Sequence, residues 1–234
     1  GDEEVGTPAN REIVEAEAAR NRYVLVPEPA RRNGGVVTGR YAIARFNLST
    51  RGKPSHAGLR LDEGVSAIRE MAHQILAVEA LTDAEVGFNV GVVHGGQWAN
   101  CVATHCEAKV LASATTDEAL ARATDRMKAL RPQNPAVEVR VEQDVVRPVW
   151  TTNDETWKLY HHASELARGL GFEIPHQNSG GGSDGNFTGA LGVPTLDGLG
   201  ARGDGPHTLG EHIVTESLAE RGRLMAALLA TLTA

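Results

Sequence analysis

The chain has 234 residues, a formal net charge of −7 and 41% hydrophobic residues, ordinary values for one large or two small soluble domains. This acidic balance excludes the concentrated basic face of a nucleic-acid-binding protein, and no apolar run approaches the roughly 20 residues of a membrane helix. The spacing of Cys101 and Cys106 suits neither a zinc ribbon nor a disulfide framework, so the cytoplasm is the expected location, with an upstream signal peptide as an open alternative.

The first predicted elements are short. Residues 8–19 predict a helix with Pro8 near its first turn, and residues 23–27 predict an apolar strand. The stretch "ARRNGG" (30–35) then breaks the chain. Apolar and polar residues alternate over 39–52 with a one-residue slip, which predicts an antiparallel strand that can carry a bulge.

The middle of the chain predicts the order β-α-β-β-α-β. A helix is expected over 64–81, since its apolar residues recur at helical spacing. These apolar residues are Val65, Ile68, Ala72, Ile75, Leu76 and Val78. The other elements are strands over 86–96, 103–114 and 136–146 and a helix over 116–130, with Thr116 as its cap. This order fits a ferredoxin-like layer, an antiparallel sheet with helices on one face.

The last third predicts helices over 154–171 and 215–232, with a short strand over 193–198. Between them "GGGSDG" (180–185) matches G-x-G-x-x-G, the dinucleotide fingerprint. The preceding "FEIPHQNS" is polar and contains a proline, which argues against a buried strand there. A nucleotide site is therefore the weaker alternative, and a tight loop that leads into a short helix capped by Ser183 or Asp184 is favoured.

Several acids and histidines are candidates for chemistry. Glu3 and Glu4 are adjacent, so one carboxylate can bind a metal while the other holds a water. Glu28 follows the first strand between two prolines, and His207 lies on a glycine- and proline-rich loop. His56 lies between a strand and a helix. Taken singly, the three glutamates and His207 are better explained as surface residues, and His56 is as easily a capping residue as a catalytic one.

Seven motifs occur together in one order: "DEEVG", "PEP", "GKPSHAG", "GGQWANCV", "VVRP", "SGGGSDGNF" and "GPHT". On these motifs the chain resembles the dinuclear zinc metallopeptidases that include glutamate carboxypeptidase, aminoacylase, acetylornithine deacetylase and succinyl-diaminopimelate desuccinylase. The resemblance covers the whole chain, and "GKPSHAG" and "SGGGSDGNF" are its most specific parts. It implies an α/β catalytic domain that a ferredoxin-like lid interrupts, and subunits that dimerise through the lid. The lid is expected over 37–149, and the ranges 1–36 and 150–234 are expected to be parts of the catalytic domain.

The resemblance also implies roles in catalysis and metal binding. Glu3 matches the general base that activates a metal-bridging water, and Glu4 matches a zinc ligand. Glu28 matches the acidic ligand of the second zinc, and His207 matches the late histidine ligand. His56 matches the lid histidine that stabilises the oxyanion in the partner subunit's site. Two Zn²⁺ ions per subunit are expected in the complete enzyme, with Co²⁺ or Mn²⁺ as alternatives.

Four further residues match positions that contact substrate in the family. Asn100 matches a lid residue, and Arg147 matches an arginine that grips a substrate carboxylate. Gly181 and Gly182 match a backbone stretch that faces the substrate. Leu111 stands where family members often carry a lid arginine, which leaves open how the end of the substrate is held.

The metal site implied by the resemblance needs an earlier His-x-Asp stretch and a bridging aspartate, both upstream of "DEEVG". Glu4, Glu28 and His207 alone are too few for two metals, because one zinc takes about four ligands. A C-terminal fragment of a longer enzyme is therefore expected. The predicted function is zinc-dependent hydrolysis of peptide or amide bonds, of the carboxypeptidase or N-acyl-amino-acid deacylase type. The expected partners are a small substrate and a second subunit, with no nucleic acid or membrane; the alternative is a non-catalytic dimerisation fragment.

Overall fold

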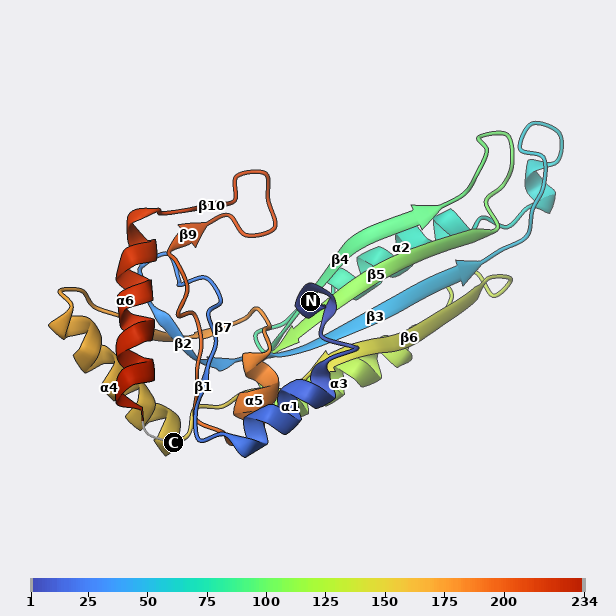
Figure 1. The fold of residues 1–234 in the computed structure, drawn as a ribbon. Helices are drawn as coiled ribbons and strands as arrows, with labels where there is room; N and C mark the ends of the chain where they lie inside the picture. Colours follow the sequence, from blue (N-terminus) through green and yellow to red (C-terminus); the bar gives the residue numbers. More distant parts are fainter. Residues whose placement is uncertain (1, 233–234) are drawn as a thin grey trace. The chain divides into compact units, whose positions relative to one another are not determined.

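The computed structural model describes residues 2–232. Gly1, the first residue of the predicted range 1–36, and Thr233 and Ala234, the last residues of the predicted range 150–234, lie outside the described residues. The chain divides into two compact units (Figure 1). Unit 1 comprises Gly1–Tyr41 and Arg147–Ala234, and unit 2 comprises Ala42–Val146. Unit 2 is thus inserted into the sequence of unit 1. No helix among residues 2–232 is long and apolar enough to span a bilayer.

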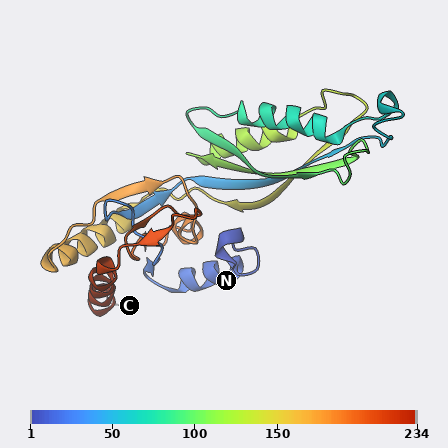
Figure 2. The same ribbon diagram turned by 90° about the horizontal axis from the view of Figure 1, so that it is seen from above.

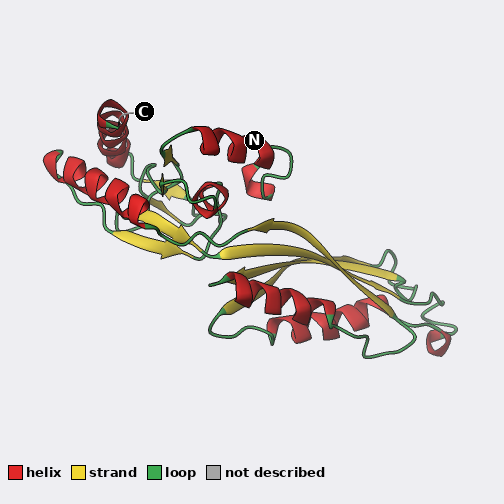
Figure 3. Ribbon diagram, turned by 90° about the horizontal axis from the view of Figure 1, so that it is seen from below, coloured by secondary structure: helices red, strands yellow, loops and turns green. Residues whose placement is uncertain are grey.

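Unit 2 is an antiparallel sheet with two helices on one face (Figures 2 and 3). Its strands form the order β4-β5-β3-β6, and its elements follow the predicted sequence β-α-β-β-α-β. The elements are β3 (Ala42–Arg51), η2 (Leu61–Glu63), α2 (Ala67–Glu79), β4 (Val86–Gly95), β5 (His105–Ala114), α3 (Asp117–Lys128) and β6 (Glu138–Arg147), whose last residue belongs to unit 1. The predicted α/β class is therefore confirmed.

The two central strands of unit 2, β3 and β5, largely alternate in burial as the sequence pattern predicts. On β3, Phe46 and Leu48 are buried under the helices while Asn47 and Ser49 lie on the open face. Ten consecutive pairs join β3 to β5 without a break in register. Side chains at Ser66 and Thr116 accept hydrogen bonds from the first turns of α2 and α3, so both helices begin at capped positions.

The buried face of α2 differs from the one that the apolar spacing favours. Glu70 and Gln74 are buried, whereas Ile68 and Leu76 are 44% and 69% exposed. The Glu70 carboxylate accepts hydrogen bonds from the main-chain N–H groups of Gln133 and Asn134 at 2.8 and 3.0 Å, and from the Gln74 amide at 2.8 Å. These bonds satisfy a carboxylate that would otherwise be costly to bury, so the helix turns polar residues inward and apolar residues outward.

Unit 1 is built from short strands and peripheral helices. Its elements are η1 (Glu3–Val5), α1 (Arg11–Arg20), β1 (Val24–Leu25), β2 (Val36–Arg40), α4 (Asp154–Gly169), β7 (His176–Ser179), α5 (Gly185–Ala190), β8 (Thr195–Leu196), β9 (Gly203–Asp204), β10 (His212–Ile213) and α6 (Glu216–Thr231). Strand β1 pairs with β8, and β2 pairs with β7; both pairs are parallel. Main-chain hydrogen bonds between Val37 and Asp197 join the two pairs.

The core of unit 1 lies between its strands and the helices α4 and α6. Residues from both helices, including Leu159 and Leu224, pack against Val36 and Leu196 of the strands. Trp150 is buried against α5, where the absent side chain of Gly189 leaves room for the indole ring. These contacts tie the C-terminal part of the chain to the strands of its first 41 residues.

Two predictions of secondary structure need correction, and the predicted lid range differs at its ends from unit 2. The strand predicted over 39–52 is two strands, since β2 ends at Arg40 and β3 begins at Ala42. The first pairs with β7 and the second with β5. The predicted lid range, 37–149, therefore takes in β2, which the structure counts with unit 1. The segment before the glycine-rich loop does form a strand, β7, because pairing with β2 overrides its polar composition.

Candidate active site

Glu3 lies in η1 and is held at two points by Arg147. The Arg147 Nη1 atom is 2.6 Å from the Glu3 carboxylate Oε1, and Nη2 donates to the main-chain oxygen of Glu3 at 2.6 Å. The Arg147 side chain is 5% exposed and that of Glu3 is 31% exposed. The carboxylate therefore reaches solvent while its arginine partner is buried.

Two further residues complete this network. Arg147 Nη2 donates to the Thr7 hydroxyl at 3.3 Å, and the Thr7 hydroxyl donates to the Asp184 carboxylate. Thr7 is buried and has a φ of 60°, which is strained for a β-branched residue. Such a conformation persists only where the surroundings fix it, so the segment after η1 is held firmly against the start of α5.

Glu4 and His207 meet on the surface of unit 1. The His207 Nε2 atom is 3.7 Å from the Glu4 Oε2 atom, and both side chains are about three-quarters exposed. His207 has a φ of 63°, a left-handed conformation that is rare outside glycine. It follows Gly205 and Pro206 in the loop between β9 and β10, whose shape is set by a hydrogen bond from the Thr208 hydroxyl to the Gly205 carbonyl at 2.7 Å.

Glu28 follows β1 and is half-buried. Burial raises the pKa of its carboxyl group, and the negative charges of Glu3, Asp197 and Glu4 raise it further, against the lowering effect of Arg40. Three predicted site carboxylates therefore share one electrostatic environment. Acids gathered in this way repel each other unless a cation lies among them.

Residues 2–232 contain no group of three or more His, Cys, Asp or Glu side chains placed to hold a metal ion. Glu4 and His207 form a pair, and Glu28 interacts with Glu4 through charge without completing a set of three. The donor types suit a divalent metal, but the number falls short of the roughly four ligands of a zinc site. The described residues thus fit part of a metal site and not a whole one.

The glycine-rich loop between β7 and α5 is held by a buried ion pair. Arg40 Nε is 2.7 Å from Asp197 Oδ2, and Arg40 Nη1 donates to the Gly181 carbonyl at 2.7 Å. Asp197 also accepts from the Ser183 hydroxyl. Gly181 and Gly182 are exposed while Ser183 is buried, so the loop exposes its main chain at the two glycines and is anchored at Ser183. Arg40 and Asp197 thus position this loop, although neither stands in a recognisable motif.

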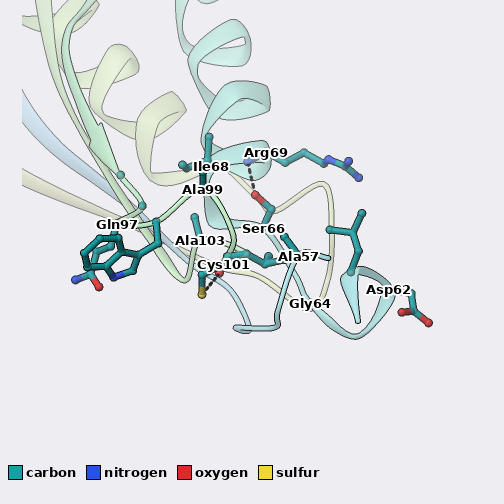
Figure 4. A pocket seen from close by; sticks show the side chains of 15 residues that line it. Ala57, Asp62, Gly64, Ser66, Ile68, Arg69, Gln97, Ala99, Cys101 and Ala103 are labelled. Atoms are coloured by element: carbon teal, nitrogen blue, oxygen red, sulfur yellow. Dashed lines mark hydrogen bonds between the residues drawn. The ribbon is translucent and has the colours of Figure 1, made fainter. Parts of the chain in front are cut away.

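His56 and Asn100 belong to unit 2, where neighbouring loops bring them together. The N–H of Ala57 donates to the Asn100 carbonyl at 2.9 Å, and His56 pairs with Cys101 in an antiparallel bridge. Both side chains are exposed. Beside them lies an open hollow of about 890 Å³, whose lining includes Ala57 and Cys101 together with the exposed Trp98 (Figure 4).

Arg147, which is predicted to grip a substrate carboxylate, has a buried guanidinium group that is bonded to Glu3. Leu111, where the family often has an arginine, lies on β5 directly across from Arg45 on β3. Residues directly opposite on antiparallel strands share a face. An arginine is therefore present one strand away from the expected position.

Comparisons with known proteins find a family match and similar sequences. Residues 38–136 match the family described as the peptidase dimerisation domain of the M20 type. Carboxypeptidase G2 from Pseudomonas sp. (strain RS-16) is 28% identical over 97% of this chain and 56% of its own length. Acetylornithine deacetylase from Myxococcus xanthus is 34% identical over 45% of this chain and 30% of its own length.

Solved structures of peptidases are also similar to this chain. Aminopeptidase PepT from Bacillus cereus has a TM-score of 0.66 at 26% identity and covers 95% of this chain. A tripeptidase from Staphylococcus aureus has a TM-score of 0.68 at 26% identity and covers 93%. In both cases this chain covers 61% of the other chain. The fold of this chain is thus similar to that of these two peptidases.

Residues 38–136 are thus similar to the dimerisation domain of M20 peptidases, and relatives named as a carboxypeptidase, a deacetylase, an aminopeptidase and a tripeptidase match the chain within and beyond this range. The chain spans about half the length of the relatives that it matches over most of its own residues, Carboxypeptidase G2 among them.

Proposed function

We propose that this chain is part of a metal-dependent hydrolase of peptide or amide bonds. The observation that carries the proposal is the 3.7 Å contact between Glu4 and His207 in unit 1, with Glu3 next to Glu4 in sequence and Glu28 within range of the charges of both glutamates. These four residues come from three separate stretches of sequence, and a family relationship to peptidases accompanies them. A group of acids and a histidine with like-charge repulsion is typical of a site that a cation completes.

Glu3 is proposed as the general base. Its carboxylate is partly exposed and held by Arg147, so it can accept a proton from an attacking water and return it to the leaving amine. The water oxygen forms a bond to the carbonyl carbon, and the C–N bond then breaks as the amine takes the proton. His56 of unit 2 is proposed as a donor to the developing oxyanion in the partner subunit's site, and exposed Asn100 as a contact to substrate.

Glu4, Glu28 and His207 are proposed to supply part of the metal ligands. A bound divalent cation lowers the pKa of its water and polarises the substrate carbonyl. Zinc suits these nitrogen and oxygen donors, with Co²⁺ and Mn²⁺ as alternatives. Because the three residues do not make a complete set, the remaining ligands must come from groups other than residues 2–232 of one chain.

The proposed substrate class is small peptides or N-acyl amino acids. Relatives named as a carboxypeptidase and a deacetylase support this class. The exposed backbone at Gly181 and Gly182 allows a substrate to approach the main chain closely, since no Cβ stands in its way.

The test of this function is Glu3→Gln in the whole protein. Turnover of an N-acyl amino acid or dipeptide that the wild type cleaves should fall by about 10²-fold or more, because proton transfer is lost. Metal content, measured by mass spectrometry of the native protein, should stay unchanged. Full turnover in the variant would contradict the role of Glu3.

Unit 2 is proposed to form a homodimer through α2 and the edge strand β4. The stripe of Ile68, Ala72 and Leu76 is exposed, and Val92 and Val93 of β4 are exposed beside an unpaired strand edge. A second copy of this chain is the natural occupant, since this region matches a peptidase dimerisation domain.

Light scattering tests the dimer with a matched pair of variants. Leu76→Lys, on the proposed surface, should convert a dimer into a monomer, whereas Ala121→Lys on the exposed side of α3 should not. A dimer that survives Leu76→Lys would place the interface elsewhere.

A non-catalytic dimerisation fragment is the second candidate. The incomplete set of metal ligands favours it. Measurement of bound zinc separates the two, because a metal content near two per chain is incompatible with a fragment that lacks a metal site.

A further inference from the structure

Arg147 lies at the end of β6 with its guanidinium group in the interior of unit 1. Its cation faces the ring of Phe187, with 5.6 Å between the guanidinium carbon and the ring centroid. A buried cation is costly unless it has an anionic partner and hydrogen-bond acceptors. The contacts of Arg147 therefore identify the groups that keep it in this position.

The first of these groups is Glu3, which Arg147 contacts twice. One guanidinium nitrogen is 2.6 Å from the Glu3 side-chain oxygen, and another donates to the Glu3 main-chain oxygen at 2.6 Å. A planar guanidinium with several donors can make both contacts at once, whereas a lysine ammonium on a flexible stem cannot reproduce this fork. The two contacts together fix both the backbone of η1 and the direction of the carboxylate.

The second group ties this pair to the glycine-rich loop. Arg147 Nη2 donates to the hydroxyl of Thr7, which in turn donates to the carboxylate of Asp184. The same nitrogen lies 3.8 Å from Asp184 Oδ1. Asp184 is the residue directly before α5, where the loop ends. One chain of contacts thus runs from Glu3 through Arg147 and Thr7 to this loop.

We propose that Arg147 is a positioning residue that fixes the carboxylate of Glu3 relative to the glycine-rich loop, and not a residue that grips the substrate. This inference rests on the proposed function, in which Glu3 moves a proton and the loop faces the substrate. The oxygen of a general base must lie about 3 Å from the atom whose proton it takes. Contacts that hold the Glu3 carboxylate in one position therefore contribute to the rate.

Hydrogen–deuterium exchange tests the network without any need for activity. The N–H groups of Val5, Gly6 and Thr7 are bonded within the turn that contains Glu3. In Arg147→Met these amides should exchange about tenfold faster or more, because a charge-assisted contact to their turn is lost. Arg147→Lys, which keeps the charge and is easier to accommodate, should give a smaller change in the same direction.

Arg11→Met is the matched control for this experiment. Arg11 also lies over the Phe187 ring, at 4.7 Å, and its guanidinium group forms an ion pair with Glu15 of the same helix. Exchange at residues 5–7 should stay at the wild-type rate in this variant. Equal exchange in Arg147→Met, Arg147→Lys and wild type would overturn the proposal.

Kinetics then separate positioning from substrate binding. The whole protein is assayed on an N-acyl amino acid and on its carboxamide, which lacks the terminal charge. If Arg147 positions Glu3, Arg147→Lys lowers kcat by about 10- to 100-fold on both substrates and leaves KM unchanged. A rise in KM confined to the carboxylate substrate would overturn the proposal. Absence of turnover in the wild type would instead count against the proposed function, and the exchange experiment would still decide the role of Arg147.

Discussion

The two units of the chain reach stability by different means. Unit 2 has ten-residue strands, of which β3 and β5 pair in continuous register, and its helices cover an apolar sheet face that contains Phe46 and Leu48. Unit 1 has strands of two to five residues, joined by buried ion pairs such as Arg40–Asp197. Unit 2 thus has long strand ladders over apolar packing, whereas unit 1 adds buried charged side chains with specific partners to its apolar core.

This difference follows from the work proposed for each unit. A surface that joins two copies needs a rigid frame and exposed apolar residues, which unit 2 provides through its sheet and α2. A site that holds a base and metal ligands needs charges, and charges near the interior need compensating partners. Accordingly, the proposed base Glu3 pairs with the buried Arg147, and the buried Arg40 donates to the carbonyl of Gly181.

The largest expected effect breaks the ion pair of unit 1. Asp197→Ala leaves the buried Arg40 cation without its carboxylate and should lower the free energy of unfolding by about 3–5 kcal/mol. Asp204→Ala is the control, since its pair with Arg32 is exposed and should contribute less than about 1 kcal/mol. Calorimetry measures both. Similar values for the two variants would show that unit 1 does not depend on its buried charges.

The next effect concerns the one buried carboxylate of α2 in unit 2. Burial would raise the pKa of Glu70, but hydrogen bonds from Gln133, Gln74 and Asn134 outweigh it and hold the pKa below the usual 4.5. Stability from this group is present above pH 4.5 and is lost as the pH falls through the lowered pKa.

Glu70→Gln should therefore cost about 1.5–3 kcal/mol at pH 7 and less at pH 3, where the wild type has lost part of the same stabilisation. Urea unfolding at the two pH values measures the difference. Glu79→Gln, on an exposed position of the same helix, should change little at either pH. A cost for Glu70→Gln that does not depend on pH would assign the effect to packing.

The smallest expected effect compares one glycine from each unit. A Cβ at Gly189 would lie within 2.1 Å of the Trp150 ring, so Gly189→Ala should destabilise unit 1 by about 1–3 kcal/mol. A Cβ at Gly87 on β4 meets nothing within 4 Å, and Gly87→Ala should stay within about 0.5 kcal/mol of wild type. The unfolding temperatures of the two variants distinguish them. Equal shifts in the unfolding temperature would mean that Trp150 moves aside without cost.

The sequence predicts unit 2 better than unit 1 for a physical reason. Strands such as β5 and β6 alternate strictly, and Thr116 caps the helix that its position predicts. Such signals are local and can be found from a few neighbouring residues. The buried face of α2 escapes prediction because Glu70 is satisfied by residues 133 and 134, which lie far along the sequence.

The site is only partly predictable. The motif around Glu3 and Glu4 and the loop of His207 mark candidate residues, and the Glu4 and His207 side chains lie 3.7 Å apart. Arg40 and Asp197 leave no local signal, since their importance arises from a pairing across 157 positions of sequence. Arg147 stands in a motif, but the motif alone gives no sign of its bond to Glu3.

The insertion of unit 2 has a consequence for folding. Strands β2 and β7 must pair although all of unit 2 separates them in sequence, and the entropic cost of closing a loop grows with its length. Strands β3 and β6, which begin and end unit 2, are neighbours in one sheet. Once that sheet has formed, the chain entering it and the chain leaving it are held side by side. If unit 2 folds early, it shortens the effective loop that must close when β2 pairs with β7. The order in which the two units fold therefore affects how readily unit 1 assembles.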